Sequence, residues 1–241
     1  MKNIALIFAG GTGSRMSTRA LPKQFLELNG KPIIIHTLEH FEFNDEVDAI
    51  CVVCLKGWEQ HLRTQMERFG IKKVKYIVEG GATGQESIFN GLKAVYEKEP
   101  KPEECLMLMH DGVRPLINSK VISDCIECAR EHGSAVTVTS AYETIITTSG
   151  EGSIENVVDR SCAKLARAPQ CYFLSDIYTA HLRAQAEAYT GAIDSATLMR
   201  HYGKTIYTVE GPVENIKITT ASDFFMARAI IEARENSQIF G

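Results

Sequence analysis

Short apolar runs alternate with segments of helical periodicity along the first half of this chain, and this alternation strongly restricts the fold. The apolar runs predict strands at 3–9, 47–54, 74–78 and 105–109. The segments that follow them predict helices at 32–43, with Pro32 in the first turn, and at 57–69, 85–97 and 121–131. Strands that alternate with helices of this length form βαβ units with a mostly parallel sheet. We therefore expect a Rossmann-like α/β fold that binds its ligand at the carboxyl ends of the strands.

The second half of the chain breaks this alternation. Three β-like runs, interrupted by a turn at 149–153, lie at 135–139, 143–148 and 154–158. They predict a hairpin extension, followed by helices at 175–188 and 194–201, strands at 205–209 and 215–219, and a last helix at 221–235. An exposed hairpin has unpaired edges, which a second subunit could cover. We expect residues 1–241 to form a single domain with a hairpin arm at about 136–170, through which the chain forms a homodimer.

Composition limits the kind of ligand. The chain has 241 residues, of which 44% are hydrophobic, and a net charge of −4. This net charge gives no overall basic field for nucleic acid. No apolar run approaches the ~18–20 residues that cross a membrane, and no signal peptide is visible. We expect a cytoplasmic protein with neither nucleic acid nor membrane as a partner.

The seven cysteines include two pairs with the spacing of zinc ligands, Cys51/Cys54 and Cys125/Cys128. The first pair lies inside a strand-like run, where residues three apart point to opposite faces of a sheet. The separation between the two pairs also fits no usual zinc site. Buried free thiols are therefore the preferred interpretation, with zinc as the alternative.

A glycine-rich, basic stretch follows the first strand. It reads Ala9-Gly10-Gly11-Thr12-Gly13-Ser14-Arg15-Met16, with Pro22-Lys23-Gln24 after it. The dinucleotide-binding fingerprint would need a third glycine where Met16 stands, and a Walker loop would need Gly-Lys-Ser/Thr where Arg15 stands. Glycines let the backbone approach a ligand, and Arg15 and Lys23 add two positive charges, so the stretch predicts a polyphosphate site. The alternative is a tight turn with two solvated basic residues.

With the later motifs, the chain resembles the cytidylyltransferases that activate sugar-alcohol phosphates, a branch of the nucleotidyltransferases. This branch contains the ribitol-phosphate and methylerythritol-phosphate enzymes, the latter of isoprenoid precursor synthesis. The later motifs are Gly80-Gly81 with Ser87, His110-Asp111-x-x-Arg114-Pro115, Val158-Asp159-Arg160, Pro169-Gln170 and Asn215-Ile216-Lys217-Ile218-Thr219. They occur in the family's order across nearly the whole chain, and the ordered set is highly specific.

The resemblance implies a nucleotidyltransferase fold and attack of a polyol phosphate on the α-phosphorus of CTP, with release of pyrophosphate. It implies that Arg15, Lys23, Arg160 and Lys217 are catalytic. The nucleotide-binding residues would be Phe8, Ala9, Gly10, Gly11, Thr12, Gly13, Gly80, Gly81, Gln85, Ser87 and Gly112. The polyol phosphate would be bound by Arg114, Arg160, Asp194 and Lys217, with Arg160 reaching the site of the partner subunit.

The resemblance also implies Mg²⁺ as the cofactor, and Asp111 is the expected ligand. Several of these side chains have simpler alternatives. Asp111 and Asp194 could each cap a helix, and Lys217 could be a solvated lysine. Arg114 could support the site or tie the start of the next helix to Asp111.

Three positions depart from the family's pattern, at Gly84, Ala168 and Ile193, where an arginine and two hydroxyl side chains are common. Arg167 precedes the second of them. The spacing of Arg15 and Lys23, together with Val113, favours D-ribitol 5-phosphate, with 2-C-methyl-D-erythritol 4-phosphate as the alternative. A glycosyltransferase is disfavoured because the chain has no D-x-D triplet. A non-catalytic nucleotide-binding protein remains the other alternative.

Overall fold

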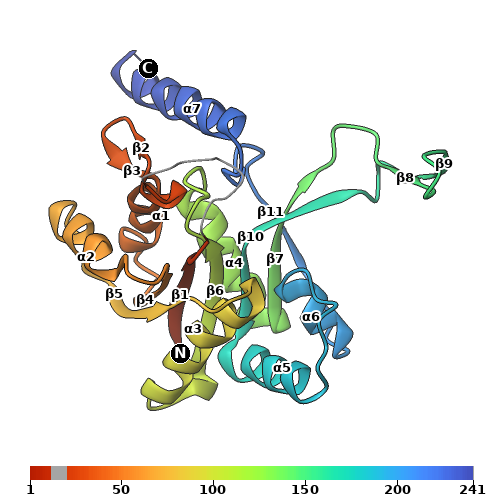
Figure 1. Ribbon diagram of the computed structural model, residues 1–241, viewed down its shortest axis with the longest axis horizontal. Coiled ribbons are helices and arrows are strands. Elements are labelled where there is room, and N and C mark those ends of the chain that lie inside the picture. Colours follow the sequence, from red (N-terminus) through yellow and green to blue (C-terminus); the bar gives the residue numbers. More distant parts are fainter. Residues whose placement is uncertain (12–20, 241) are drawn as a thin grey trace.

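A seven-stranded sheet forms the centre of the computed structural model, which describes residues 1–11 and 21–240, with side chains as far as Asn236. The strand order is β11-β7-β10-β6-β1-β4-β5. Figure 1 shows the sheet between helices on both sides. The strands are β1 (Lys2–Ala9), β4 (Ala49–Cys54), β5 (Val74–Glu79), β6 (Cys105–Asp111), β7 (Ser134–Ser140), β10 (Lys164–Phe173) and β11 (Thr208–Glu210).

The helices cover the two faces of the sheet, because β1 and its neighbours are apolar on both. Alternate residues of β1 enter different cores: Ala5 and Ile7 join one cluster, and Ile4 and Leu6 join the other. The first cluster packs under α1 (Ile33–Glu42), α2 (Glu59–Arg68) and α4 (Ser119–His132). The second packs under α3 (Gly84–Lys98), α5 (Leu174–Ala186) and α6 (Ser195–His201). The predicted α/β class with a mostly parallel, helix-flanked sheet is confirmed.

The order of the strands places a crevice beside β1. This strand pairs in parallel with β4 on one side and with β6 on the other, so the chain changes direction across the sheet at this point. Ligands of open α/β sheets bind outside the carboxyl ends of strands at such a switch point. The predicted location of the site therefore agrees with the strand order.

The strand β10 was not predicted. It runs antiparallel to both of its neighbours, β6 and β7, whereas the other neighbouring pairs in the sheet are parallel. Its first residues are exposed and its later ones are buried, so no single alternation runs along it. A pattern that changes halfway along a strand gives no clear period in the sequence.

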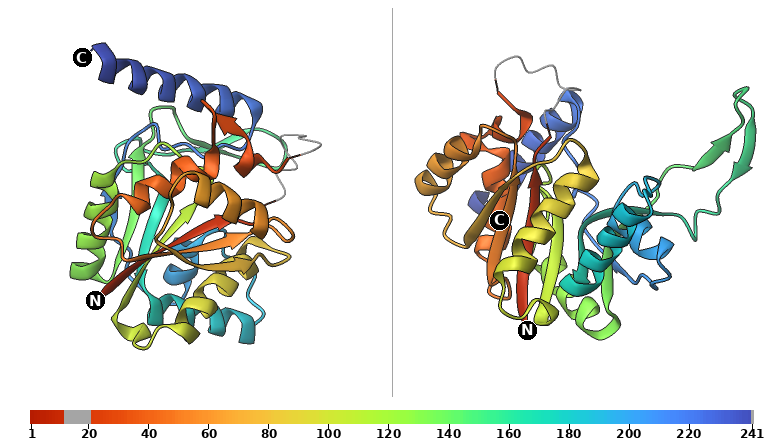
Figure 2. Two further views of the ribbon diagram at one scale, coloured as in Figure 1. Left: turned by 90° about the vertical axis from the view of Figure 1, so that its left-hand side faces the viewer. Right: turned by 60° about the horizontal axis from the view of Figure 1, so that its bottom comes forward.

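The hairpin arm is shorter than predicted. The segment that projects from the sheet lies between Ser140 and Lys164, since residues on either side belong to β7 and β10. It carries the antiparallel pair β8 (Ile146–Thr148) and β9 (Ile154–Val157). Figures 1 and 2 show this arm extending away from the body of the molecule.

The C-terminal helix α7 (Ala221–Phe240) packs on a small separate core. Ala227 and Ile231 contact a cluster with Leu28, Ile33 and Ile218. The first of these, Leu28, belongs to the hairpin of β2 (Glu27–Leu28) and β3 (Lys31–Pro32). Figure 2 shows α7 lying over this end of the molecule.

Two local expectations near this core were wrong. Pro32 ends β3 and precedes α1, instead of forming the first turn of the helix. Residues 215–219 have no regular secondary structure, although Ile218 N donates to Val113 O at 2.9 Å.

None of the seven cysteines forms a disulfide. In the two pairs, Cys51, Cys54 and Cys125 are buried and Cys128 is partly buried. Cys51 and Cys54 enter opposite cores, which confirms that they point to different faces of β4. Over residues 1–11 and 21–240, no group of three or more acidic, histidine or cysteine side chains is arranged to hold a metal ion. Within the same ranges, no helix has the length and apolar character to cross a membrane.

Replacing Leu92 by Ala should lower the free energy of unfolding by about 2–5 kcal/mol, because the change leaves a cavity where α3 packs on the sheet. Leu92 is fully buried in the second core. Its neighbour Lys93 is exposed, so Lys93→Ala is a matched control that should change the value by less than about 0.5 kcal/mol. Urea unfolding followed by the fluorescence of the single tryptophan, Trp58, measures both. Equal effects of the two substitutions would contradict the packing of α3.

Candidate active site

A cavity of about 940 Å³ opens at the carboxyl ends of β1 and β6. Its walls come from the end of β1, the start of α3, the end of β6, part of β10 and the segment before α6. From the predicted set, the residues that line it are Phe8, Ala9, Gly10, Gly11, Lys23, Gly81, Gln85, Ser87, Asp111, Arg114, Asp194 and Lys217. The structure thus brings most of the predicted residues to one place.

Glycines allow the strand ends to approach one another at this cavity. A side chain on Gly10 would begin 3.5 Å from Gly80 Cα, and one on Gly112 would begin 3.0 Å from Phe8 O. Gly112 N instead donates to that carbonyl at 2.8 Å, and Gly80 N donates to Cys54 O at the same distance. These contacts hold the ends of β1, β4 and β6 together. Neither Gly80 nor Gly112 itself lines the cavity.

Three residues predicted for the glycine-rich loop, Thr12, Gly13 and Arg15, lie outside the described residues. Their roles stay predictions. The described chain stops at Gly11 before this loop and resumes at Leu21. The Gln24 side chain is buried and donates to Ala9 O at 2.7 Å.

Lys23 lies at the wall of the cavity, where the short helix Lys23–Phe25 positions it. Its Nζ donates to Ile218 O at 3.1 Å. The aromatic ring of Phe25 stacks on Trp58 with centroids 5.3 Å apart, which anchors the short helix to the body of the protein. Lys23 is therefore a positioned cation at the cavity, not a mobile surface lysine.

Asp111 is the centre of a charged cluster at the end of β6. Lys217 Nζ lies 2.6 Å from Asp111 Oδ1, and Arg114 Nε lies 2.7 Å from Asp111 Oδ2. Burial raises the pKa of Asp111, but the charges of Arg114 and Lys217 outweigh it and hold that pKa well below its usual range. Asp111 is therefore ionised at neutral pH.

These contacts decide between the alternatives left open for Asp111 and Lys217. Asp111 caps no helix, since the next one, α4, is capped by Asn118, whose side chain accepts from Val121 N. Lys217 is partly exposed, but its ion pair with Asp111 rules out a merely solvated lysine. Arg114 both lines the cavity and supports Asp111, so each of its two suggested roles has a structural basis.

A buried histidine contacts the backbone of this cluster. His110 is fully buried, and its Nε2 lies 3.1 Å from Arg114 O. Burial lowers the pKa of His110 to about 3, so the ring is neutral at physiological pH. Arg114 in turn donates from a terminal guanidinium nitrogen to Asn215 O at 2.9 Å. The cluster thus joins the end of β6 to the segment that carries Lys217.

The wall at the start of α3 contains Ser87 and Gln85. Ser87 Oγ accepts from Gly81 N at 3.0 Å and donates to Thr83 O at 2.9 Å, so it fixes the turn after β5. Gln85 Nε2 donates to Ala192 O at 3.1 Å, which ties α3 to the segment before α6. Gly84 has open space around the position of a side chain. The backbone could therefore accommodate an arginine at position 84. Because Gly84 has no side chain, the wall carries no charge at this position.

Asp194 caps α6, in agreement with the simpler of its two interpretations. Its Oδ1 accepts from Thr197 N at 2.8 Å, and its Oδ2 accepts from Gln170 Nε2 at 3.1 Å. Asp194 also lines the cavity, with Ile193 and Ala168 beside it in the same wall. The two departures from the family's pattern therefore face the ligand space as apolar side chains.

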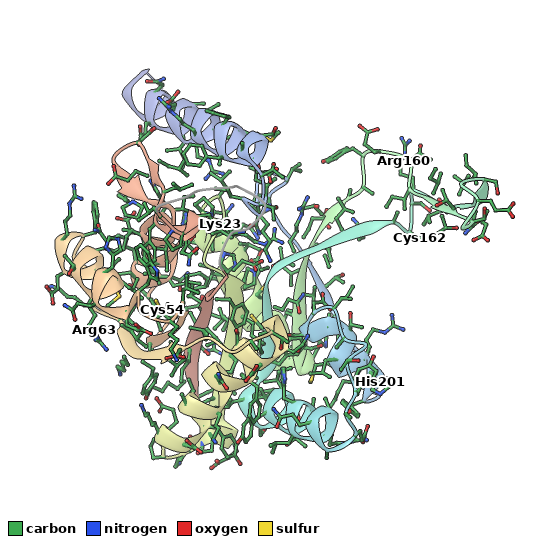
Figure 3. The ribbon with its side chains drawn as sticks, in the orientation of Figure 1. Lys23, Cys54, Arg63, Arg160, Cys162 and His201 are labelled. Atoms are coloured by element: carbon green, nitrogen blue, oxygen red, sulfur yellow. The ribbon has the colours of Figure 1, made fainter. Side chains whose placement is uncertain are left out.

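Arg160 does not join this cavity within one chain. It lies on the arm, and its guanidinium donates to Thr144 Oγ1, also on the arm, at 3.1 Å. Figure 3 shows Arg160 on the projecting hairpin, well apart from Lys23 at the body. Its predicted role therefore depends on an arrangement between subunits.

Sequence reasoning assigned no role to Arg167, although this residue lines the cavity. Its neighbour in the cavity wall, Gln170, also contributes by orienting Asp194. The signal in the sequence was a basic residue inside an apolar, strand-like run. It could not be used to predict a site residue, because β10 itself was not predicted.

Among the described residues, the cavity lining holds more positive than negative charge. The cations are Lys23, Arg114, Arg167 and Lys217, whereas the carboxylates are Asp111 and Asp194. Such a lining attracts a polyanion into a chain whose overall charge is negative. Transfer reactions at phosphorus need this kind of positioned charge more than covalent catalysis.

Comparisons with known proteins agree with this chemistry. The family model described as 2-C-methyl-D-erythritol 4-phosphate cytidylyltransferase matches residues 3–233. A ribitol-5-phosphate cytidylyltransferase from Vibrio parahaemolyticus is 50% identical over 239 residues, which are 99% of this chain and 100% of the relative. A 2-C-methyl-D-erythritol 4-phosphate cytidylyltransferase from Clostridium acetobutylicum is 33% identical over 95% of this chain and 97% of its own. The crystal structure of 4-diphosphocytidyl-2C-methyl-D-erythritol synthase from Anaerococcus prevotii superposes with a TM-score of 0.83, at 26% identity and 96% coverage of both chains.

Replacing Asp111 by Asn should lower the free energy of unfolding at pH 7 by about 1–3 kcal/mol, because Arg114 and Lys217 would lose their shared counter-ion. Since the folded-state pKa of Asp111 is depressed, its contribution is complete above the unfolded pKa of about 3.9 and is lost as pH falls through the lower folded value. The deficit of the variant should therefore be constant above about pH 5 and narrow below it. Urea unfolding at several pH values measures this difference.

The matched control is Asp45→Asn, because Asp45 is exposed on a loop. It should leave the stability nearly unchanged at every pH. A variant at Asp111 that is as stable as wild type at pH 7, or a deficit that widens in acid, would contradict the ion-pair account.

Proposed function

The chain belongs to the family of 2-C-methyl-D-erythritol 4-phosphate cytidylyltransferases, and from this we propose that it transfers a cytidylyl group from CTP to D-ribitol 5-phosphate. The observation that carries the reaction is the Asp111 cluster with Lys217 and Arg114 in a cationic cavity at the switch point of the sheet. The choice of alcohol follows similarity: the ribitol-phosphate relative is 50% identical, against 33% for the methylerythritol-phosphate relative.

The proposed reaction is a displacement at the α-phosphorus of CTP. An oxygen of the acceptor phosphate forms a new bond to this phosphorus. The bond from the α-phosphorus to the oxygen that bridges to the β-phosphate breaks. Pyrophosphate leaves with that electron pair, and CDP-ribitol remains. The protein contributes alignment of the two phosphates and compensation of their charge.

In this proposal Lys23 and Arg15 bind the triphosphate. The backbone hydrogen bond from Lys23 to Ile218 O directs this ammonium at the cavity wall. Negative charge increases on the departing pyrophosphate, and a fixed ammonium stabilises it without reorganisation. The backbone at Gly10 and Gly11 is bare, so phosphate oxygens can approach its N–H groups. The base would lie along Gly81, Gln85 and Ser87 at the start of α3.

Lys217 is proposed to hold the acceptor phosphate, and Asp111 fixes its ammonium. Because Asp111 balances Lys217 and Arg114 together, the cluster keeps net positive charge to share with a phosphate. Asp194 is proposed to contact the polyol, although both of its oxygens already accept hydrogen bonds.

Asp111 also fits Mg²⁺, as one ligand among others. Each of its oxygens accepts one bond from a cation and keeps a second acceptor position. Since the described residues hold no acidic cluster, the remaining ligands would be phosphate oxygens and water, which is a common arrangement for Mg²⁺. When bound, the ion neutralises charge on the transferred phosphate and the leaving group.

Arg160 is proposed to act in the site of a partner subunit. The arm exposes large apolar side chains, namely Tyr142, Ile146, Ile154 and Val157. Exposed apolar side chains on a projecting hairpin favour association, and a symmetric dimer would place each arm on the other subunit. The proposed enzyme is a cytoplasmic homodimer with CTP and a polyol phosphate as its partners, and with no nucleic acid or membrane.

The direct test is pyrophosphate release with CTP, Mg²⁺ and a panel containing D-ribitol 5-phosphate, other pentitol phosphates and 2-C-methyl-D-erythritol 4-phosphate. We expect kcat/KM for D-ribitol 5-phosphate to exceed that for the methylerythritol compound by at least ~10-fold, the size of effect that a few substrate contacts give. Mass spectrometry identifies the CDP-alditol. Preference for the methylerythritol compound would reverse the choice of alcohol. CTP binding without turnover of any alcohol would favour a non-catalytic nucleotide-binding protein.

Action across a dimer predicts complementation between two inactive variants. Arg160→Ala and Lys217→Ala should each be nearly inactive alone. A mixed dimer has one site with both residues and one site with neither. Random exchange of equal amounts should therefore restore about a quarter of wild-type activity, because half of the dimers are mixed and each has one intact site. No recovery, with exchange shown by native mass spectrometry, would mean that Arg160 acts within its own chain or not at all.

A further inference from the structure

Arg167 lies in an irregular part of β10, next to the cavity. Residues 166 and 170 of β10 pair with residues 138 and 136 of β7. Three residues of β10 therefore stand opposite one residue of β7. Bulges of this kind occur next to active sites, where they change the direction of a side chain.

The protein holds this bulge by its backbone. Thr137 Oγ1 donates to Pro169 O at 2.8 Å, and Asn215 Nδ2 donates to Ala168 O. Thr137 and Asn215 are both buried. The bulge therefore keeps its shape without help from the guanidinium of Arg167.

The guanidinium itself is only partly bonded. Arg167 Nε donates to Thr139 Oγ1 at a long 3.4 Å. Within the described ranges 1–11 and 21–240, its terminal nitrogens make no hydrogen bond and its charge has no carboxylate partner. Burial, together with repulsion from Arg114, lowers the pKa of Arg167. A cation beside another cation, with both terminal nitrogens free to donate, suits an anion that both can share.

The order of the strands in the sheet indicates which anion Arg167 would bind. From the glycine-rich end of β1, the next strand is β6 with Asp111, and the strand after that is β10 with Arg167. Arg167 thus lies across Asp111 from the proposed triphosphate site. The part of the cavity lining next to Arg167 includes Ala168, Gln170 and Asp194, of which only the capping aspartate is charged.

We propose that Arg167 binds the phosphate group of the acceptor alditol phosphate and so selects phosphorylated over free alditols. This inference rests on the proposed function, since it assumes that the acceptor occupies the side of the cavity beyond Asp111. A phosphate monoester carries about −1.5 to −2 charges at pH 7, enough to share between Arg167 and the excess charge of the Asp111 cluster. Arg167 is a binding residue in this account, and the chemistry at phosphorus stays with the residues around Asp111.

The test measures the two substrates separately by equilibrium titration. A CTP analogue with a methylene group between the α- and β-phosphorus, together with Mg²⁺, fills the nucleotide site without turnover. Onto this complex, D-ribitol 5-phosphate should bind about 10- to 100-fold more weakly for Arg167→Leu than for wild type, the usual worth of a charge-assisted pair. Arg167→Lys should recover part of the loss, and affinity for the CTP analogue should change by less than ~3-fold.

The matched control is Arg63→Leu, because Arg63 is exposed on α2, away from the cavity (Figure 3). It should bind both ligands like wild type. Thermal unfolding of Arg167→Leu should resemble that of wild type, since the bulge is held by Thr137 and Asn215. An equal loss of affinity for the CTP analogue would assign Arg167 to the triphosphate and overturn the proposal, as would unchanged binding of D-ribitol 5-phosphate.

A second probe separates this inference from the proposed function. If no alditol phosphate in the panel binds to wild type, the proposed function fails. Titration with inorganic phosphate then still tests Arg167. Phosphate binding that weakens in Arg167→Leu and not in Arg63→Leu would retain the anion site, whereas equal binding to wild type and both variants would overturn it.

Discussion

The carboxylate of Asp111 connects parts of the chain that are far apart in sequence. It pairs with Arg114 beside it and with Lys217 about a hundred residues later. Arg114 then bonds to Asn215 O, and Asn215 bonds to Ala168 O in the bulge of β10. Because charged groups in a partly buried place need partners, this one carboxylate fixes the positions of several cavity walls at once.

The same cluster explains why residues 215–219 can serve the site without secondary structure. This segment is held at specific atoms instead. Ile218 bonds to Val113 O and receives Lys23 at its carbonyl, and Lys217 is fixed by Asp111. An irregular segment can present both backbone oxygens and side chains to a ligand, whereas a strand inside a sheet uses its backbone for pairing.

The sequence predicted the first half of the fold well, because its strands are apolar throughout and its helices have clear apolar stripes. Helices α1 to α4 begin and end within about two residues of the predicted bounds. The sequence did not predict β10, because that strand passes from an exposed arm into the sheet and contains a bulge at 167–169. Because β10 was not predicted, the sequence could not place Arg167 at the cavity. Asp111 and Lys217 were found from motifs, but their direct contact needed the structure.

In the proposed dimer, Arg160 gives the arm a part in the reaction of the acceptor. Within one chain, the side of the cavity beyond Asp111 holds Lys217, Arg114 and Arg167, all of them carried by the body of the protein. Asp111 holds Lys217 and Arg114, and the bulge of β10 places the backbone of Arg167, so all three lie at the cavity within one chain. Arg160, by contrast, bonds to Thr144 on the arm, and in the proposal it reaches a cavity when two subunits pair. A free acceptor phosphate can thus be recognised by the body first. In the proposed dimer, Arg160 from the partner would then increase the positive charge around that phosphate. Turnover, more than initial binding, would be the step that depends on the dimer.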